Sequence, residues 1–193
     1  MTASSILRRF ALLALPLLVT ACDSADTDDS FFLPAQRVEF DFVFEGGSLD
    51  PGVLNDVISE NAESLIGYIE NRGFSVDDVI GATIRDGSAE FRIAQPPFGA
   101  GVNGFERVEV RIRTEGATTA GTPVAIGTGF TGTSDTADLE IRANDFTTTV
   151  QVGAFEAILQ VEPSDDILDE TYRVEVGFDV LIEVESGAAR PAL

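Results

Sequence analysis

Cys22 carries the only thiol of this 193-residue chain, and neither histidine nor lysine occurs anywhere in it. Nucleophilic schemes that pair serine or cysteine with histidine, or serine with lysine, therefore have no base to use. Zinc sites built from histidine and cysteine fail for the same reason. A solitary thiol also cannot form an internal disulfide. The catalytic chemistry that remains is that of a carboxylate pair, as in glycoside hydrolysis.

The carboxylates do not form a recognisable catalytic or metal-binding set. No segment carries the closely spaced acidic triplet on one strand face, with aromatic neighbours, that a catalytic cleft on such a fold usually has. The chain also has no tryptophan and only two tyrosines with which to stack a sugar. The densest acidic cluster consists of Asp165, Asp166, Asp169 and Glu170. Oxygen-rich loops can bind calcium, but this one lacks the alternating ligands and the turn glycine of an EF-hand, so we interpret it as a solvated turn. We expect no enzyme activity, no cofactor and no metal site.

Two glycine-rich segments, residues 99–104 and 127–133, are superficially similar to phosphate-binding loops. No strand leads directly into the first, no helix follows it, and no lysine exists to reach a phosphate. We interpret both segments as turns between strands.

The N-terminus has the layout of a secretory signal. Arg8 and Arg9 precede an apolar run of ten residues at 10–19, which is too short to span a bilayer permanently. The segment Leu18-Val19-Thr20-Ala21-Cys22 that follows resembles the lipobox of bacterial lipoproteins. The resemblance implies cleavage after Ala21 and attachment of diacylglycerol to Cys22, which would anchor the mature chain to a membrane. The alternative is an ordinary signal whose cleavage site happens to lie beside a cysteine.

Charge limits the possible partners. Removing residues 1–21, which hold two of the twelve basic residues and no acid, leaves ten arginines against 33 acids, a net charge of −23. Such a chain repels nucleic acids and anionic lipids, so we exclude nucleic-acid binding. This acidity is typical of proteins from saline habitats, although codon bias alone could also produce it.

The acidic residues 23–30 predict a flexible tether. They also resemble the surface-export signals of Bacteroidetes lipoproteins, whereas an Asp directly after the lipidated cysteine favours inner-membrane retention in enterobacteria. We expect an exported protein on the outer membrane, at its periplasmic face or on the cell surface.

Strict alternation of apolar and polar residues predicts half-buried strands at residues 37–45 and 172–185. We expect Phe40, Phe42, Phe178 and Val180 to lie in the core. Similar patterns predict further strands at residues 79–84, 89–93, 108–112, 123–126, 139–141, 147–152 and 155–161. Asp86-Gly87 predicts a hairpin turn between two of them.

One segment has a helical period instead. Apolar residues recur at three- and four-residue steps between Asp50-Pro51, which could cap a helix, and Gly73, which could stop it. We predict an amphipathic helix over about residues 51–71, packed on a sandwich of eight or nine antiparallel strands.

The order of these segments resembles a family of uncharacterised β-sandwich lipoproteins from Bacteroidetes-like bacteria. The resemblance covers about residues 50–186 and rests on residues 73–84, 91–93, 105–116 and 137–141 with the last strand. It implies a β-sandwich and no particular activity. We divide the chain into a signal peptide (1–21), a lipidated cysteine with its tether (22–35), a sandwich domain (36–186) and a tail (187–193).

Function follows from these expectations as a hypothesis. We expect a non-catalytic binding or structural module of the cell envelope, anchored to the membrane through Cys22, with a protein or envelope glycan as partner. The alternative is a carbohydrate-active enzyme or glycan-binding module that uses a carboxylate-lined groove.

Overall fold

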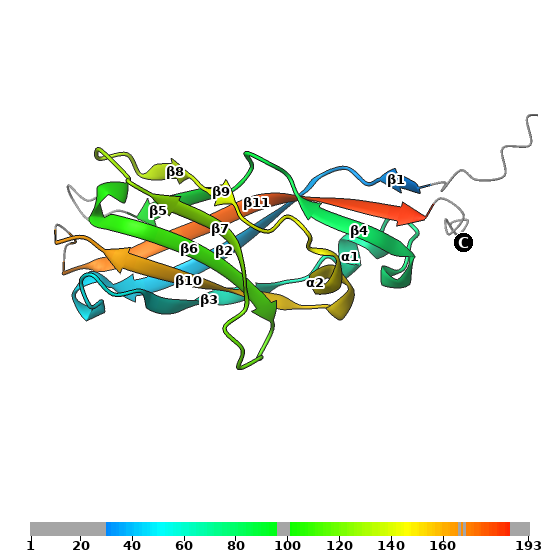
Figure 1. The fold of residues 1–193 in the computed structure, drawn as a ribbon. Helices are drawn as coiled ribbons and strands as arrows, with labels where there is room; N and C mark the ends of the chain where they lie inside the picture. Colours follow the sequence, from blue (N-terminus) through cyan, green and yellow to red (C-terminus); the bar gives the residue numbers. More distant parts are fainter. Residues whose placement is uncertain (1–29, 96–100, 166, 168, 186–193) are drawn as a thin grey trace, which may run out of the picture.

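The computed structural model describes residues 30–95, 101–165, 167 and 169–185, and these form two antiparallel β-sheets packed face to face (Figure 1). Sheet A contains β1 (Ser30–Phe32), β2 (Gln36–Glu45), β4 (Val79–Ile84), β5 (Glu90–Gln95), β8 (Thr136–Asp138) and β11 (Thr171–Glu185). Sheet B contains β3 (Asn55–Glu63), β6 (Phe105–Thr114), β7 (Thr122–Thr128), β9 (Glu140–Ile141) and β10 (Phe155–Pro163). The predicted mainly β sandwich is confirmed.

Sheet A is organised around β11, a strand of 15 residues. Along one edge of β11, β1 pairs with residues 183–185 and β2 pairs with residues 171–180. Along the other edge, β4 pairs with residues 180–184, β5 pairs with residues 173–177, and β8 extends the sheet beyond β5. The last strand of the sequence therefore joins four earlier ones. Sheet B is simpler, with the order β3-β10-β6-β7-β9.

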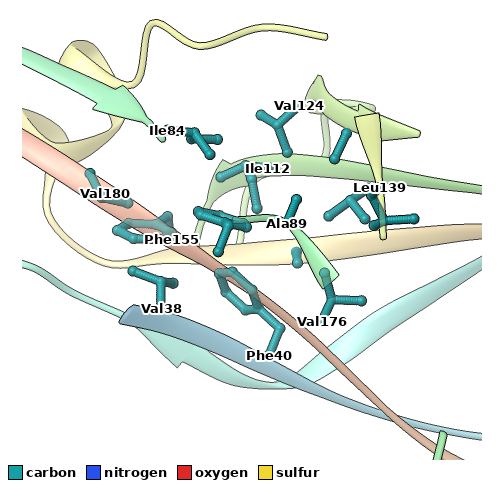
Figure 2. Packing of buried hydrophobic residues seen from close by; sticks show 14 of the residues in the cluster. Val38, Phe40, Ile84, Ala89, Ile112, Val124, Leu139, Phe155, Val176 and Val180 are labelled. Atoms are coloured by element: carbon teal, nitrogen blue, oxygen red, sulfur yellow. The ribbon is translucent and has the colours of Figure 1, made fainter. Parts of the chain in front are cut away.

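The core lies between the two sheets and consists of the inward side chains of their alternating strands. Phe40, Phe42, Phe178 and Val180 are all fully buried, as predicted. The ring of Phe146 lies edge-on to Phe178, with ring centroids 5.8 Å apart, and Phe40 contacts both Phe155 and Phe178. Figure 2 shows Phe40 among aliphatic side chains contributed by both sheets. Burial of these large apolar side chains supplies the main driving force for packing one sheet on the other.

The predicted helix at residues 51–71 is wrong over most of its length. Residues Asn55–Glu63 form β3, whose side chains alternate between half-buried and exposed, and only Ile66–Glu70 form a short helix, α1. The C-terminal stop was correctly located, because Gly73 has φ 85° and donates its N–H to the carbonyl of Glu70. Three 3-10 turns, Gly46–Ser48, Val76–Asp78 and Val102–Gly104, also occur in the described residues.

The strand predicted at residues 147–152 is also wrong, because Thr147–Val152 form a short helix, α2. The helix covers the free edge of β4, where the N–H of Ala82 donates to Oγ1 of Thr147 and the N–H of Phe146 donates to the carbonyl of Ala82. Burial of Phe146 and Val150 on one side of the helix favours it over the extended form that Thr and Val otherwise prefer.

Asp86-Gly87 forms a turn, with Gly87 at φ 71°, but not the predicted hairpin. Strands β4 and β5 do not pair with each other, since both pair with the same edge of β11, end to end. At the gap between them, Oγ of Ser88 accepts a hydrogen bond from the N–H of Asp179. The turn therefore separates β4 from β5 along one edge of β11, while β11 itself continues without interruption.

Candidate functional site

The outer face of sheet A is hollowed by an open groove of about 430 Å³ that runs across three neighbouring strands. The groove is lined by Asp41, Phe42 and Val43 of β2, Glu60 of β3, Arg92, Ala94 and Gln95 of β5, and Arg173, Val174 and Glu175 of β11. We call it the sheet A groove. Most of its lining is polar, which indicates a site for a hydrophilic ligand rather than an apolar one.

Two irregularities in the strands shape this groove. The register of β5 against β11 shifts between Arg173 and Val174, so that Ala94 is an extra residue. The register of β3 against β10 shifts between Glu156 and Ile158, opposite the part of β3 that contains Glu60. Bulges bend a strand and redirect its side chains, and they are frequent near binding sites. The second bulge lies at the part of β3 that contributes Glu60, a residue of sheet B, to the groove on sheet A.

The charges of the groove are only partly neutralised. Arg92 forms an ion pair with Glu175, with 3.0 Å between Nη2 and Oε2. Arg173 is exposed, and its guanidinium group forms no hydrogen bond or ion pair with any described residue. The groove thus offers a guanidinium group, an amide at Gln95 and the carboxylates of Asp41 and Glu60. These groups can together donate and accept hydrogen bonds, as recognition of a polyhydroxylated ligand requires.

Beside the groove, Asn61 joins the edges of the two sheets. Its side-chain amide donates to the carbonyl of Glu39 at 2.9 Å and accepts from the N–H of Asp41 at 2.8 Å. The amide also donates to Oε1 of Glu63 at 3.0 Å. Burial raises the pKa of Glu63, the hydrogen bond from Asn61 opposes that rise, and the negative charges of Glu39 and Asp41 add to it. This end of the groove is therefore a region of crowded negative charge.

The outer face of sheet B differs because the arginines of β6 form ion pairs with neighbouring glutamates. Glu109 is buried and pairs with both Arg107 and Arg111, which lie two residues away on the same face of β6. Arg113 pairs with Glu156 across the β6–β10 register at 2.6 Å. A hollow of about 320 Å³ beside Arg113 lies against the β6–β7 loop. Since Arg111 and Arg113 donate to carbonyls of that loop, we interpret them as structural.

The candidate site residues named from the sequence either do not line this groove or lie outside the described residues. Cys22 is outside them, as is Asp166 of the acidic cluster. Asp165, Asp169 and Glu170 are exposed, and no group of three or more potential metal ligands occurs within the part of the chain that the structure describes. In the first glycine-rich segment, a side chain at Gly101 would approach the backbone of Thr133 to 2.7 Å, which explains a glycine there by close packing.

The groove residues were not predicted from the sequence. The available signal was the pair of arginines on the outward positions of two expected strands, Arg92 and Arg173. Nothing in the sequence indicated that β5 and β11 are neighbours, or that Glu60 belongs to a strand. The position of the groove therefore depends on the strand order.

Comparison with known proteins adds no family to this description. Within the described residues, no helix is both long and apolar enough to cross a membrane. No protein-family model matches the chain, and neither a curated protein nor a solved structure matches it.

Proposed function

We propose that this protein is an exported lipoprotein, held on a membrane through lipid on Cys22, whose β-sandwich is a non-catalytic binding module of the cell envelope. The observation that carries the proposal is the solitary thiol placed directly after Leu18-Val19-Thr20-Ala21 and an apolar run with two arginines before it. A thiol that cannot form an internal disulfide is best explained in an exported protein by attachment of lipid.

The strength of the anchor follows from its chemistry. Each methylene of an acyl chain buried in the bilayer contributes about 0.8 kcal/mol, and stable anchoring requires more than one chain. A diacylglycerol group on Cys22 meets that requirement without any membrane-spanning segment. We propose the outer membrane as the location, at its periplasmic face or on the cell surface.

Metabolic labelling with a fatty-acid analogue tests the anchor. We expect label on the wild-type chain and none on Cys22→Ser. The double variant Cys22→Ser/Ser24→Cys is a matched control, because it keeps one thiol but moves it away from the lipobox. Label on wild type alone supports the proposal. Equal label on all three chains, or an unlabelled wild-type protein released with the periplasmic fraction, would overturn it.

The sheet A groove is the proposed binding surface of the module. Arg173 and the carboxylates of Asp41 and Glu60 have no ion-pair partner among the described residues, so they are free to contact a ligand. This arrangement favours a second candidate function, a glycan-binding module, because hydroxyl groups need both donors and acceptors. The groove lacks an exposed aromatic ring on which a sugar could stack, so hydrogen bonds would supply most of the affinity.

Titration calorimetry with soluble cell-envelope glycan fragments separates the two candidates. The Cys22→Ser chain is the parent, because it carries no lipid. Glycan binding that is lost in Arg173→Ala but kept in Arg142→Ala, a control at the residue after β9 that does not line the groove, would establish the glycan module. Absence of binding to every fragment would favour a protein partner. Turnover of a glycan that one groove carboxylate substitution abolishes would show an enzyme and overturn the non-catalytic proposal.

A further inference from the structure

Exposed apolar side chains are concentrated at the end of the sandwich where β1 begins. Seven large apolar residues are exposed in the described part of the chain, and four of them lie here, namely Phe31 (40% exposed), Phe32 (60%), Ile80 (51%) and Val152 (56%). In Figure 1 this end holds β1, β4 and the tip of β11, opposite the turn between β2 and β3. We call these four side chains the apolar tip.

Strand pairing brings the apolar tip together. Phe31 lies opposite Val184, and Phe32 lies opposite Glu183. On the other side of β11, Val184 pairs with Val79, the residue before Ile80. The side chain of Gln151, next to Val152, donates to the carbonyl of Val79 at 2.9 Å and so attaches the end of α2 to the same place. All four residues are thus connected to the last residues of β11.

The apolar tip exposes both faces of its outermost strand. Neighbouring residues of a strand point to opposite faces, so Phe31 and Phe32 project on opposite sides of β1. Phe31 makes an edge-on contact with Phe74, with ring centroids 5.3 Å apart, yet remains substantially exposed. A protein partner that covered one face would leave the other in water. If this end enters an apolar layer, that layer covers both faces of β1.

The chain length before β1 indicates what covers this end. Seven residues, 23–29, separate Cys22 from Ser30. At about 3.3–3.6 Å per residue, the fully extended tether spans no more than about 30 Å. The far end of β11 lies about 50 Å away, since its 15 residues rise about 3.4 Å each. A lipid on Cys22 therefore keeps the apolar tip, and not the opposite end, beside the membrane.

We propose that the apolar tip docks into the surface of the bilayer that holds Cys22, so that the sandwich stands on the membrane with the β2–β3 turn pointing away. This inference rests on the proposed lipidation. The tether makes docking an intramolecular step with a high effective concentration, so a weak apolar contact suffices. Phe side chains gain free energy on entering an apolar medium from water.

Charge selects the kind of lipid surface. Glu183 lies between β1 and β4, four aspartates lie within residues 23–29, and the mature chain is strongly acidic. Anionic headgroups would repel this end, because like charges near a membrane surface oppose binding. The apolar tip is therefore suited to a surface of zwitterionic or neutral lipids, and its docking weakens as anionic lipid increases.

Single-tryptophan reporters test the docking, since the chain contains no tryptophan. Phe32→Trp places a reporter in the apolar tip, and Ile80→Trp is a second reporter there. Val53→Trp is the matched control, because Val53 is similarly exposed (53%) but follows the 3-10 turn at the opposite end. Each full-length lipoprotein is purified with its lipid, which mass spectrometry verifies on Cys22, and reconstituted into phosphatidylcholine vesicles that contain a brominated phosphatidylcholine.

We expect the brominated lipid to quench both tip reporters several-fold more than the control, and we expect part replacement by phosphatidylglycerol to reduce that quenching. Tip reporters no more quenched than the control, on chains that carry the lipid, would overturn the docking and leave the lipoprotein proposal standing. Chains without lipid would overturn both. A blue-shifted Phe32→Trp emission that grows with protein concentration without vesicles would assign the apolar tip to a second copy instead.

Discussion

The side-chain amide of Asn61 brackets Phe40, since it bonds to the backbone groups of the residues on either side of that phenylalanine. Asn61 belongs to sheet B and Phe40 to sheet A. The amide therefore forms, with the edge of β2, the hydrogen bonds that a neighbouring strand would otherwise supply. The ring of Phe40 is fully buried. Asn61 thus fixes the sheet edge that positions Asp41 at the groove.

Asn61→Ala should destabilise the fold by about 1–3 kcal/mol, because it leaves the N–H of Asp41 and the carbonyl of Glu39 without their partner. Asn61→Asp should cost more, since it adds a negative charge beside Glu39, Asp41 and Glu63. Urea unfolding measures both changes. Asn71→Ala is the control, because Asn71 is exposed at the end of α1 and its side chain bonds to no described residue. Equal stability of Asn61→Ala and Asn71→Ala would show that the hydrogen bonds of Asn61 to β2 do not stabilise the fold.

Glu63→Gln should stabilise the protein at pH 7 by less than about 1 kcal/mol, because the group is partly exposed and solvent screens its interactions. Burial raises the pKa of Glu63 above its ordinary value of 4.5. The protonated carboxyl therefore contributes stability that is present below 4.5 and is lost as the pH rises through the raised value. Glutamine keeps that contribution at every pH, and its Oε1 can still accept from Asn61.

Melting temperatures of wild type and Glu63→Gln, measured from acidic to neutral pH, test whether protonation of Glu63 stabilises the protein. The difference between the two should be largest at neutral pH and should vanish at about pH 4 and below, near the ordinary pKa of glutamate. Glu70→Gln, an exposed glutamate of α1, removes the same charge and controls for the net charge of the chain. A pH-independent difference would show that Glu63 acts through packing alone.

Phe178→Ala should cost about 3–5 kcal/mol in the free energy of unfolding, because it empties the space between Phe40 and Phe146. Phe32→Ala removes an equally large side chain from an exposed position and should change stability by no more than about 0.5 kcal/mol in solution. Chemical denaturation gives both values. A loss below about 1 kcal/mol for Phe178→Ala would be inconsistent with the described core.

Salt should stabilise the chain that the proposed cleavage after Ala21 would leave. With 33 acids against ten arginines, repulsion acts over about 30 Å at 0.01 M salt but over only about 3 Å at 1 M. The melting temperature should therefore rise over this range, and NaCl and KCl should act alike because the effect is general screening. An unchanged melting temperature would reject the repulsion argument. A stabilisation by calcium far beyond that by magnesium would instead direct attention to Asp165 and its acidic neighbours.

The strands that were predictable from the sequence are those that alternate and bury one face. In β2 and β11 the inward side chains are apolar throughout, so the period of two is visible without a structure. In β3 the pattern is reversed, because Ser59 and Asn61 are half-buried and bond to neighbouring strands while Ile58 is exposed. Because polar side chains occupy half-buried positions of β3, the apolar residues of this segment do not alternate, and their spacing was mistaken for a helical period.

The remaining differences have tertiary causes. Asp86-Gly87 has the residues of a hairpin turn, but β11 is long enough to pair with β4 and β5 in succession. The sequence does not indicate which strands β11 pairs with. In α2, burial of Phe146 and Val150 overrides a run of residues that favour strands. The groove was not predictable because it combines two shifted registers with a contribution from the opposite sheet.

The position of β11 in the chain also determines when sheet A can form. Strands β1, β2, β4 and β5 are synthesised before Thr171–Glu185. Among the described strands, β1, β2 and β4 pair only with β11, whereas β5 also pairs with β8. Contacts between residues so far apart in sequence make folding slow, and until then phenylalanine-rich β2 is open to aggregation. Sheet A therefore cannot be completed until the last strand has been synthesised, which would suit the export that we propose.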